Sequence, residues 1–141
     1  MYFKELPGVF TETNEKTTSR RTHSDARRRN HADGVRGEDM AVSYLITAGY
    51  QILERNWRFH RNEVDIIAMD GDTLVFVEVK KRHDHVHGYG CEAVNHQKQQ
   101  RIRHVAEAYL LYTKRSTEGT ICRFDVVSID DDKILLFQNA F

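Results

Sequence analysis

The chain has only two cysteines, no long apolar run and no excess of one charge. Cys91 and Cys122 are too few for a disulfide framework and lack the spacing of a metal site, and such usage is typical of a reducing cytoplasm. No apolar stretch reaches the roughly 18 residues of a membrane-spanning helix, so we expect no membrane partner. The N-terminus lacks the apolar segment of a secretory signal. We therefore expect a cytoplasmic protein.

The charge balance restricts the function classes. The 21 basic and 21 acidic residues cancel, which argues against a dedicated nucleic-acid-binding protein, because such proteins usually have a basic excess. The charges are unevenly distributed: residues 1–32 contain seven Lys or Arg and four Asp or Glu, a net charge of +3, which leaves −3 for the remainder. An acidic domain can still bind phosphates where metal ions neutralise its site.

The chain of 141 residues fits one domain and shows no internal repeat. Residues 11–30 contain almost no large apolar side chain, so they cannot bury enough surface to offset the entropy lost on ordering. We therefore expect a flexible N-terminal tail at 1–32 and a folded domain at 33–141. The run Arg27-Arg28-Arg29 is typical of a solvated tail, and the alternative is an arm that contacts phosphates.

Hydrophobic periodicity predicts two helices and five strands. The helices are expected at about 33–48, ended by Gly49, and at about 94–113. The strands are expected at 51–58, 63–69, 73–80, 122–129 and 133–137. The Asp70–Asp72 segment contains an Asp-Gly hairpin turn.

The fold class follows from how these elements can be covered. The run Leu74–Val77 is apolar at every position, so its strand should be covered on both faces. The second helix can act as a crossover that lets the strand at 122–129 join the sheet in parallel. We expect an α/β fold with a central mixed sheet of about five strands flanked by helices.

Charged residues converge at the end of the predicted hairpin. Residues two apart on a strand point to the same face, so Glu78 and Lys80 project together while Val79 points to the opposite layer. Pairing across the Asp-Gly turn places Asp65 opposite Val77 or Glu78, on a strand roughly 4.8 Å away. Two carboxylates that close repel each other, so we expect Asp65 and Glu78 to share a divalent cation.

Glu38 adds a third carboxylate from the first predicted helix. It precedes Ala41, Val42 and Leu45 by three, four and seven residues, so it shares their helix face and points toward the sheet. This direction suits a metal ligand. The structural alternative is stabilisation of the N-terminal turn through the helix macrodipole.

This constellation is typical of phosphodiester hydrolysis. A cation polarises the phosphoryl oxygen and generates hydroxide from water, and hard carboxylate ligands select Mg²⁺ or Mn²⁺. Lys80 would orient the attacking water or stabilise charge on phosphorus. The spacing alone often arises by chance, but its position on a hairpin, with the inward-facing Glu38 upstream, strengthens the prediction.

Basic residues near the constellation are candidate nucleic-acid contacts. Lys98 and Arg101 fall in the first turns of the second predicted helix, where basic side chains suit phosphates, and Arg58 and Arg82 flank the hairpin. Ordinary surface charge is the alternative for each. The three alternating histidines of residues 83–87 have no clear fourth ligand, so we do not expect a native zinc site.

Short motifs between residues 37 and 129 occur in an order that matches a known family. They are Gly37-Glu38-x-x-Ala41, Tyr44-Leu45, Gly49-Tyr50-x-Ile52-Leu53, Arg55-Asn56-x-Arg58, Glu63-Val64-Asp65-Ile66-Ile67-Ala68, Leu74-Val75-Phe76-Val77-Glu78-Val79-Lys80-x-Arg82, Glu92-Ala93-Val94, Lys98-x-x-Arg101 and Arg123-Phe124-Asp125-Val126-Val127. Asp65 followed by Glu78-Val79-Lys80 is similar to the PD-(D/E)xK nuclease signature. The chain resembles the YraN family of bacterial proteins over about two thirds of its length.

The resemblance implies a restriction-endonuclease-like fold, similar in layout to archaeal Holliday-junction resolvases. It implies a catalytic set of Glu38, Asp65, Glu78 and Lys80, with the three carboxylates as ligands of Mg²⁺ or Mn²⁺. We therefore expect a metal-dependent endonuclease that hydrolyses DNA phosphodiester bonds, with branched or damaged DNA as candidate substrates. The resemblance leaves a homodimer open.

The chain departs from the family pattern at two places. Asn62 stands where the family usually has Gly, and Cys91 stands near a position that is often Pro. Neither departure falls on the four catalytic positions. A non-catalytic nucleic-acid-binding module on a nuclease fold is the main alternative, and a scaffold protein with a structural charge cluster is a third.

Overall fold

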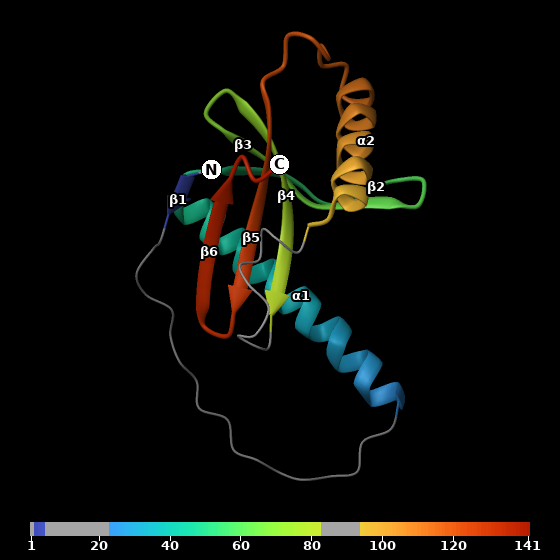
Figure 1. Ribbon diagram of the computed structural model, residues 1–141, viewed down its shortest axis with the longest axis vertical. Coiled ribbons are helices and arrows are strands. Elements are labelled where there is room, and N and C mark those ends of the chain that lie inside the picture. The colour runs from blue at the N-terminus through green and yellow to red at the C-terminus, as the bar shows by residue number, and fades with distance from the viewer. Residues whose placement is uncertain (1, 5–22, 83–93) are drawn as a thin grey trace.

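The computed structural model describes residues 2–4, 23–82 and 94–141 (Figure 1). In chain order the elements are β1 (Tyr2–Lys4), α1 (His23–Thr47), β2 (Gln51–Phe59), β3 (Asn62–Asp70), β4 (Thr73–Arg82), α2 (His96–Tyr112), β5 (Cys122–Asp130) and β6 (Lys133–Gln138). None of the helices in these ranges combines the length and the apolar character needed to cross a membrane.

The strands form one six-stranded sheet in the order β1-β6-β5-β4-β3-β2. The β4–β5 pair is parallel and the other pairs are antiparallel. The parallel pair is connected through α2, which crosses over one face of the sheet as predicted. The α/β class and the mixed sheet are thus confirmed: all five predicted strands are present, and the short β1 adds a sixth at the edge beside β6.

Each face of the sheet has its own apolar core. Along β4, Leu74 and Phe76 enter the core beneath α2, whereas Val75 and Val77 enter the core beneath α1. The strand is therefore covered on both faces, as its continuous apolar run predicted. The α2 side chains in the first core are Ile102, Val105, Ala106, Tyr109 and Leu110, and the α1 side chains in the second are Ala41, Tyr44 and Leu45.

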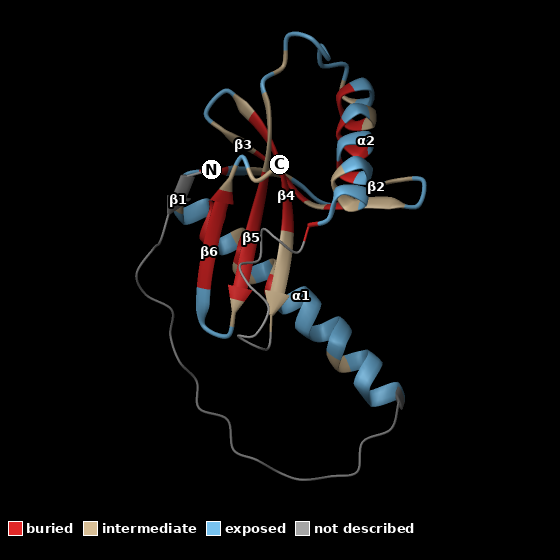
Figure 2. Ribbon diagram, viewed as in Figure 1, coloured by how far each residue is buried: buried red, intermediate tan, exposed pale blue. Residues whose placement is uncertain are grey.

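Helix α1 begins earlier than the sequence predicted. It starts at His23, ten residues before Asp33, so the expected boundary between tail and domain at residue 33 falls inside a helix. The residues from 24 to 36 are exposed apart from the half-buried Arg29, and burial begins at Gly37 (Figure 2). Periodicity missed this part of α1 because it packs no apolar stripe against the sheet.

The other end of α1 is where the sequence placed it. Gly49 has a φ of +95°, and its N–H donates to the carbonyl of Ile46 at 3.0 Å. The N–H of Tyr50 donates to the carbonyl of Leu45 at 2.9 Å. This pair of bonds is a Schellman motif, which needs a residue that tolerates positive φ. The role of Gly49 in ending α1 is thereby confirmed.

Some predictions concern residues outside the described ranges. They are those for Cys91, for the histidines of residues 83–87 and for residues 5–22 of the expected tail.

Candidate active site

The candidate site lies where the sheet divides between β3 and β4. The β3–β4 ladder starts at the pair Asp70–Thr73 and runs to the pair Ile66–Val77, in the register that the Asp-Gly turn predicted. Beyond that pair, β3 continues beside β2 and β4 continues beside β5. Strands β3 and β4 therefore stop pairing with each other beyond Ile66–Val77, and charged side chains lie at this point.

Asp65 and Glu78 are the first residues beyond the last pair. Continuing the register of Ile66–Val77 places them opposite each other, on the face covered by α2. One oxygen of Asp65 accepts a hydrogen bond of 2.7 Å from the backbone N–H of Val79. A side chain thus takes the place of a ladder partner, which fixes the Asp65 carboxylate against β4.

Two ammonium groups converge on Glu78, whose side chain is only 5% exposed. The Nζ of Lys80 lies 3.4 Å from Glu78 Oε1, and the Nζ of Lys98, from the first turn of α2, lies 3.3 Å from the same oxygen. The same-face prediction for Glu78 and Lys80 agrees with this contact. The structure also brings Lys98, predicted only as a nucleic-acid contact, into the centre of the cluster.

Negative charge in the cluster is not fully compensated by hydrogen bonds. Glu78 Oε2 is buried and has no hydrogen-bond partner among the described residues. Burial, together with the neighbouring Glu78 carboxylate, raises the pKa of Asp65 to about 7, against the smaller opposing effects of the Val79 N–H and Lys98. The cluster therefore tends to take up positive charge or a proton near neutral pH.

Glu38 lies on α1 next to the cluster, but its carboxylate is hydrogen-bonded to a residue of β2. Its Oε2 accepts a hydrogen bond of 2.9 Å from the side-chain amide of Asn56, and the guanidinium of Arg55 lies 3.9 Å away. The carboxylate is close enough to Asp65 to contribute to the raised pKa of that residue. It is thus a neighbour of the Asp65–Glu78 pair, with Asn56 as its direct partner.

The position of Asn56 depends on a change of face in the β2–β3 pair. Val64 and Ile66 are two residues apart, yet Val64 belongs to the α2-side core and Ile66 to the α1-side core, contrary to strict alternation. Asn56 lies opposite the residue between them, Asp65, and has a φ of +51°. Asn tolerates this conformation better than most residues do. Sequence reasoning missed Asn56, although it belongs to one of the family motifs.

The carboxylates fit a hard divalent cation in part. The described residues contain no group of three His, Cys, Asp or Glu side chains arranged to hold a metal ion. Mg²⁺ is usually bound by only one or two carboxylates and keeps several waters. Asp65 and Glu78 meet that requirement, and the partnerless Glu78 Oε2 is a buried acceptor that a cation would satisfy. The residues present therefore fit Mg²⁺ or Mn²⁺ at Asp65 and Glu78, with Glu38 nearby.

The other predicted nucleic-acid contacts lie on β2, α2 and β4. Arg58 forms an ion pair with Glu63 across the β2–β3 hairpin. Arg101 is exposed on α2, about one turn after Lys98, and Arg82 ends β4. Their roles stay predictions.

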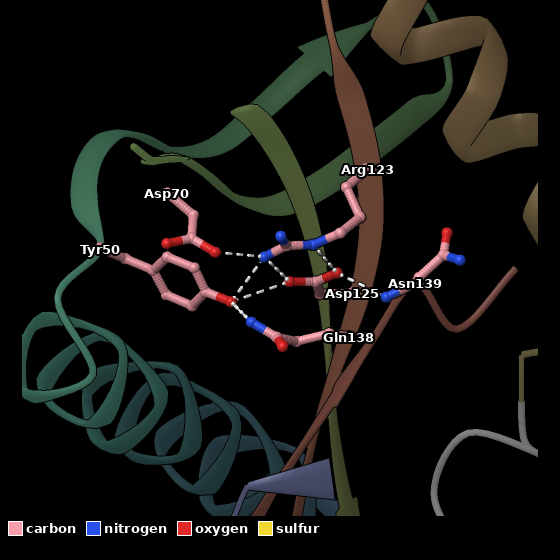
Figure 3. Close-up of polar contacts among 6 residues, drawn as sticks. All are labelled: Tyr50, Asp70, Arg123, Asp125, Gln138 and Asn139. Carbon is pink, nitrogen blue, oxygen red and sulfur yellow. Dashed lines mark hydrogen bonds and ion pairs between the residues drawn. The ribbon is translucent and has the colours of Figure 1, made fainter. Parts of the chain in front are cut away.

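A second polar cluster, the Tyr50 network, was not predicted. It consists of Tyr50, Asp70, Arg123, Asp125, Gln138 and Asn139 (Figure 3). Asp125 is fully buried and accepts from the Tyr50 hydroxyl at 3.1 Å and from Arg123 Nε at 2.8 Å. Arg123 also donates to Asp70 at 2.8 Å. Asp125 pairs with Val77, whose side chain faces α1, so this network lies on the opposite face of the sheet from Glu78.

The pKa values of the Tyr50 network indicate a structural role. Burial raises the pKa of Tyr50 to about 12, so the phenol stays protonated at neutral pH. Burial alone would lower the pKa of Arg123, but its hydrogen bonds to Asp125 and Asp70 raise it. The sequence signal was the charged pair Arg123 and Asp125 on a buried strand, but the partner Tyr50 is 75 residues away from Asp125.

Comparison with known proteins identifies the family. The chain matches the family described as "Uncharacterised protein family UPF0102" over residues 37–129. A UPF0102 protein of Persephonella marina is 45% identical over 108 residues, which cover 77% of this chain and 91% of the relative. One from Lachnoclostridium phytofermentans is 47% identical over 109 residues, covering 77% and 92%. One from Alkaliphilus oremlandii is 44% identical over 112 residues, covering 77% and 96%. The chain therefore belongs to the uncharacterised protein family UPF0102, which is the YraN family that its motifs resemble.

Proposed function

We propose that this chain is a metal-dependent endonuclease that hydrolyses phosphodiester bonds in DNA, with branched or damaged DNA as candidate substrates. The observation that carries the proposal is the buried Glu78 carboxylate, which contacts two ammonium groups through one oxygen, while its other oxygen has no hydrogen-bond partner within residues 2–4, 23–82 and 94–141. Such a group is costly to bury, and clusters of this kind gather at functional sites.

The position of each residue determines its proposed role in the reaction. Asp65, in its deprotonated form, and Glu78 would hold Mg²⁺ or Mn²⁺, with Glu38 beside them. The cation would supply Lewis-acid polarisation of the phosphoryl oxygen. Lys80 lies on the same strand face as Glu78 and would orient the attacking water or stabilise charge on phosphorus. Lys98, from the first turn of α2, would contact the phosphate group.

A cleavage screen tests this proposal. The purified chain is incubated with Mg²⁺ or Mn²⁺ on linear duplex, flap, four-way junction and single-stranded DNA. We expect cleavage of at least one of these substrates, which disappears in EDTA and falls by about 10³-fold in Lys80→Ala. Arg115→Ala, which removes an exposed positive charge after the distal end of α2, is the matched control and should cleave normally.

Two results would contradict the endonuclease proposal. One is the failure of every substrate to be cleaved with either metal. The other is equal cleavage by the wild type and Lys80→Ala, which would indicate a contaminating nuclease.

A second candidate function is a non-catalytic nucleic-acid-binding module. It is favoured by one observation: no three carboxylates in the described ranges are arranged around a common metal position. This candidate requires salt-dependent DNA binding without turnover that Asp65→Ala leaves unchanged. Loss of both metal binding and cleavage in Asp65→Ala would exclude it.

A further inference from the structure

The N-terminal part of α1 extends away from the sheet. Residues 24–36, here called the basic arm, are exposed apart from the half-buried Arg29 (Figure 2), and Figure 1 shows this end of the helix projecting past the end of β4. The family match begins at residue 37, directly after the arm. An exposed helix of this length gains little stability from its own backbone bonds, and its contact with the sheet is at Asp33, next to Lys81 of β4.

Charges on the arm are separated onto two sides. An α-helix turns about 100° per residue, so Arg27, about three turns before Glu38, points within about 20° of the direction of Glu38. His31 lies within about 20° of that direction as well, and Arg28 within about 80°. The side of the arm in line with Glu38 is therefore basic.

Both acidic residues of the arm lie on the other side. Asp25 and Asp33 point about 140° away from the direction of Glu38. Asp33 is 3.9 Å from the ammonium group of Lys81, and the backbone carbonyl of Asp25 accepts a bond from Arg29 at 3.1 Å. The remaining arginines, Arg29 and Arg36, share this side. Asp33 therefore does not offset the basic side that is continuous with the candidate site, whereas Asp25 lies about 60° from Arg28, at the edge of that side.

We propose that the side of the arm formed by Arg27, Arg28 and His31 binds backbone phosphates of duplex DNA. Guanidinium groups form bidentate hydrogen bonds with phosphate oxygens, and such contacts position a duplex without reading its sequence. The partner is argued from charge complementarity and from the continuity of this side with Glu38. This inference rests on the proposed function, because it places the bound duplex across the cleavage site.

The geometry gives the distance between the two contacts. A rise of about 1.5 Å per residue separates Arg27 from Glu38 by about 16 Å along the helix. Phosphates of one strand are spaced about 3.4 Å along the duplex axis. The arm would therefore contact the duplex about five base pairs from the scissile phosphate, beyond the acidic cluster.

The test compares two double variants with the same change in charge. Arg27→Gln/Arg28→Gln alters the side in line with Glu38, and Arg29→Gln/Arg36→Gln alters the opposite side. Gln is nearly as good a helix former as Arg, and circular dichroism checks that helix content is unchanged. Binding of a fluorescent duplex is measured by anisotropy in EDTA over a range of salt concentrations.

The plot of log affinity against log salt concentration has a negative slope. We expect the magnitude of this slope to be smaller by about 1.8 in Arg27→Gln/Arg28→Gln, because each lost phosphate contact contributes about 0.9. The slope of the control pair should stay at the wild-type value. An equal fall in both pairs, no fall in either, or a wild type that binds no duplex would overturn the inference.

The measurement also separates this inference from the proposed function, because binding in EDTA needs no turnover. If the cleavage screen fails but the salt dependence is weakened only in Arg27→Gln/Arg28→Gln, the endonuclease proposal is wrong and the DNA-binding role of the arm stands. If DNA is cleaved but both double variants have the same salt dependence, the DNA-binding role of the arm is wrong and the endonuclease proposal stands.

Discussion

The two buried polar clusters of this protein lie on opposite faces of one sheet and are built differently. In the Tyr50 network, Asp125 is fully buried, and both of its oxygens accept hydrogen bonds, from Tyr50, Arg123 and the backbone of Asn139. In the candidate site, Glu78 is almost as buried, but its Oε2 has no hydrogen-bond partner in the part of the chain that the structure describes. Saturated hydrogen bonding characterises a structural cluster, whereas the partnerless oxygen leaves capacity for a ligand.

The difference also appears in how the clusters respond to protons. Burial keeps the Tyr50 phenol protonated, with its pKa at about 12. Asp65, in contrast, has its pKa raised to about 7 by burial and by Glu78. Near neutral pH the Tyr50 network keeps its phenol proton, while Asp65 in the candidate site can gain or lose a proton. This comparison leads to four predictions, from the largest expected effect to the smallest.

The largest contrast is expected in stability. Asp125→Asn should lower the free energy of unfolding by about 3 kcal/mol, because it removes the buried charge that partners Arg123. Glu78→Gln should change it by less than about 1 kcal/mol, since lost ion pairs are offset by relief of repulsion from Asp65. Urea unfolding measures both. A cost for Glu78→Gln as large as that for Asp125→Asn would remove the distinction between the clusters.

Metal binding should depend on pH through Asp65. Because Asp65 must lose its proton to bind a cation, Mn²⁺ affinity should rise about tenfold per unit from about pH 5 to about 7 and then level off. Titration calorimetry in a pH series measures this rise, and Asp65→Asn should abolish it. In the absence of metal, stability should change with pH in the opposite direction. The pKa of Asp65 is raised from its ordinary value of 3.8 to about 7 by folding, so protonated Asp65 stabilises the folded state. This stabilisation is fully present below pH 3.8 and is lost as the pH rises through about 7. A pH-independent Mn²⁺ affinity would contradict the prediction.

Lys98 should matter more than its neighbour on α2. Lys98→Gln should lower kcat/KM for DNA cleavage by about tenfold, which corresponds to about 1.4 kcal/mol and is typical of losing one charge-assisted contact. Arg101→Gln removes the same charge about one turn further along α2 and should have a smaller effect on kcat/KM. Equal effects of the two variants would show that Lys98 acts only through the overall charge of the helix.

The smallest effect is expected at Asn56, the partner of Glu38. Asn56→Gly and Asn56→Ala both remove the hydrogen bond to Glu38 and should lower kcat/KM a few-fold. Only Asn56→Ala should also lower the free energy of unfolding, by about 1 kcal/mol, because Gly adopts positive φ without strain and Ala does not. Unchanged cleavage in Asn56→Gly would show that Glu38 needs no positioning by β2.

Local sequence patterns predicted the hairpin and the pair of carboxylates. The Asp-Gly turn determined the register, and strand alternation then placed Glu78 and Lys80 on one face. Gly49 was identified because ending a helix in the Schellman motif needs positive φ. These features depend on residues close together in sequence or on the strict period of a strand.

Features that depend on distant residues could not be predicted in this way. The start of α1 was missed because its exposed end has no apolar stripe, and the strand β1 is only three residues long. The contact of Lys98 with Glu78 depends on how α2 crosses the sheet, and the left-handed conformation of Asn56 depends on a change of face in two paired strands. The Tyr50 network joins residues from the segment after α1, from β3, β5 and β6 and from the segment after β6, and no local pattern connects them.

The bond between the Val79 amide and the Asp65 carboxylate makes one backbone position a reporter of the site. Most protected amides in a sheet depend on a neighbouring strand, so they exchange with deuterium only when strands separate. The Val79 amide depends instead on an ionisable side chain. Its exchange rate should follow the state of that carboxylate, slowing when the carboxylate is charged, while the amides of Val75 and Val77 remain unaffected.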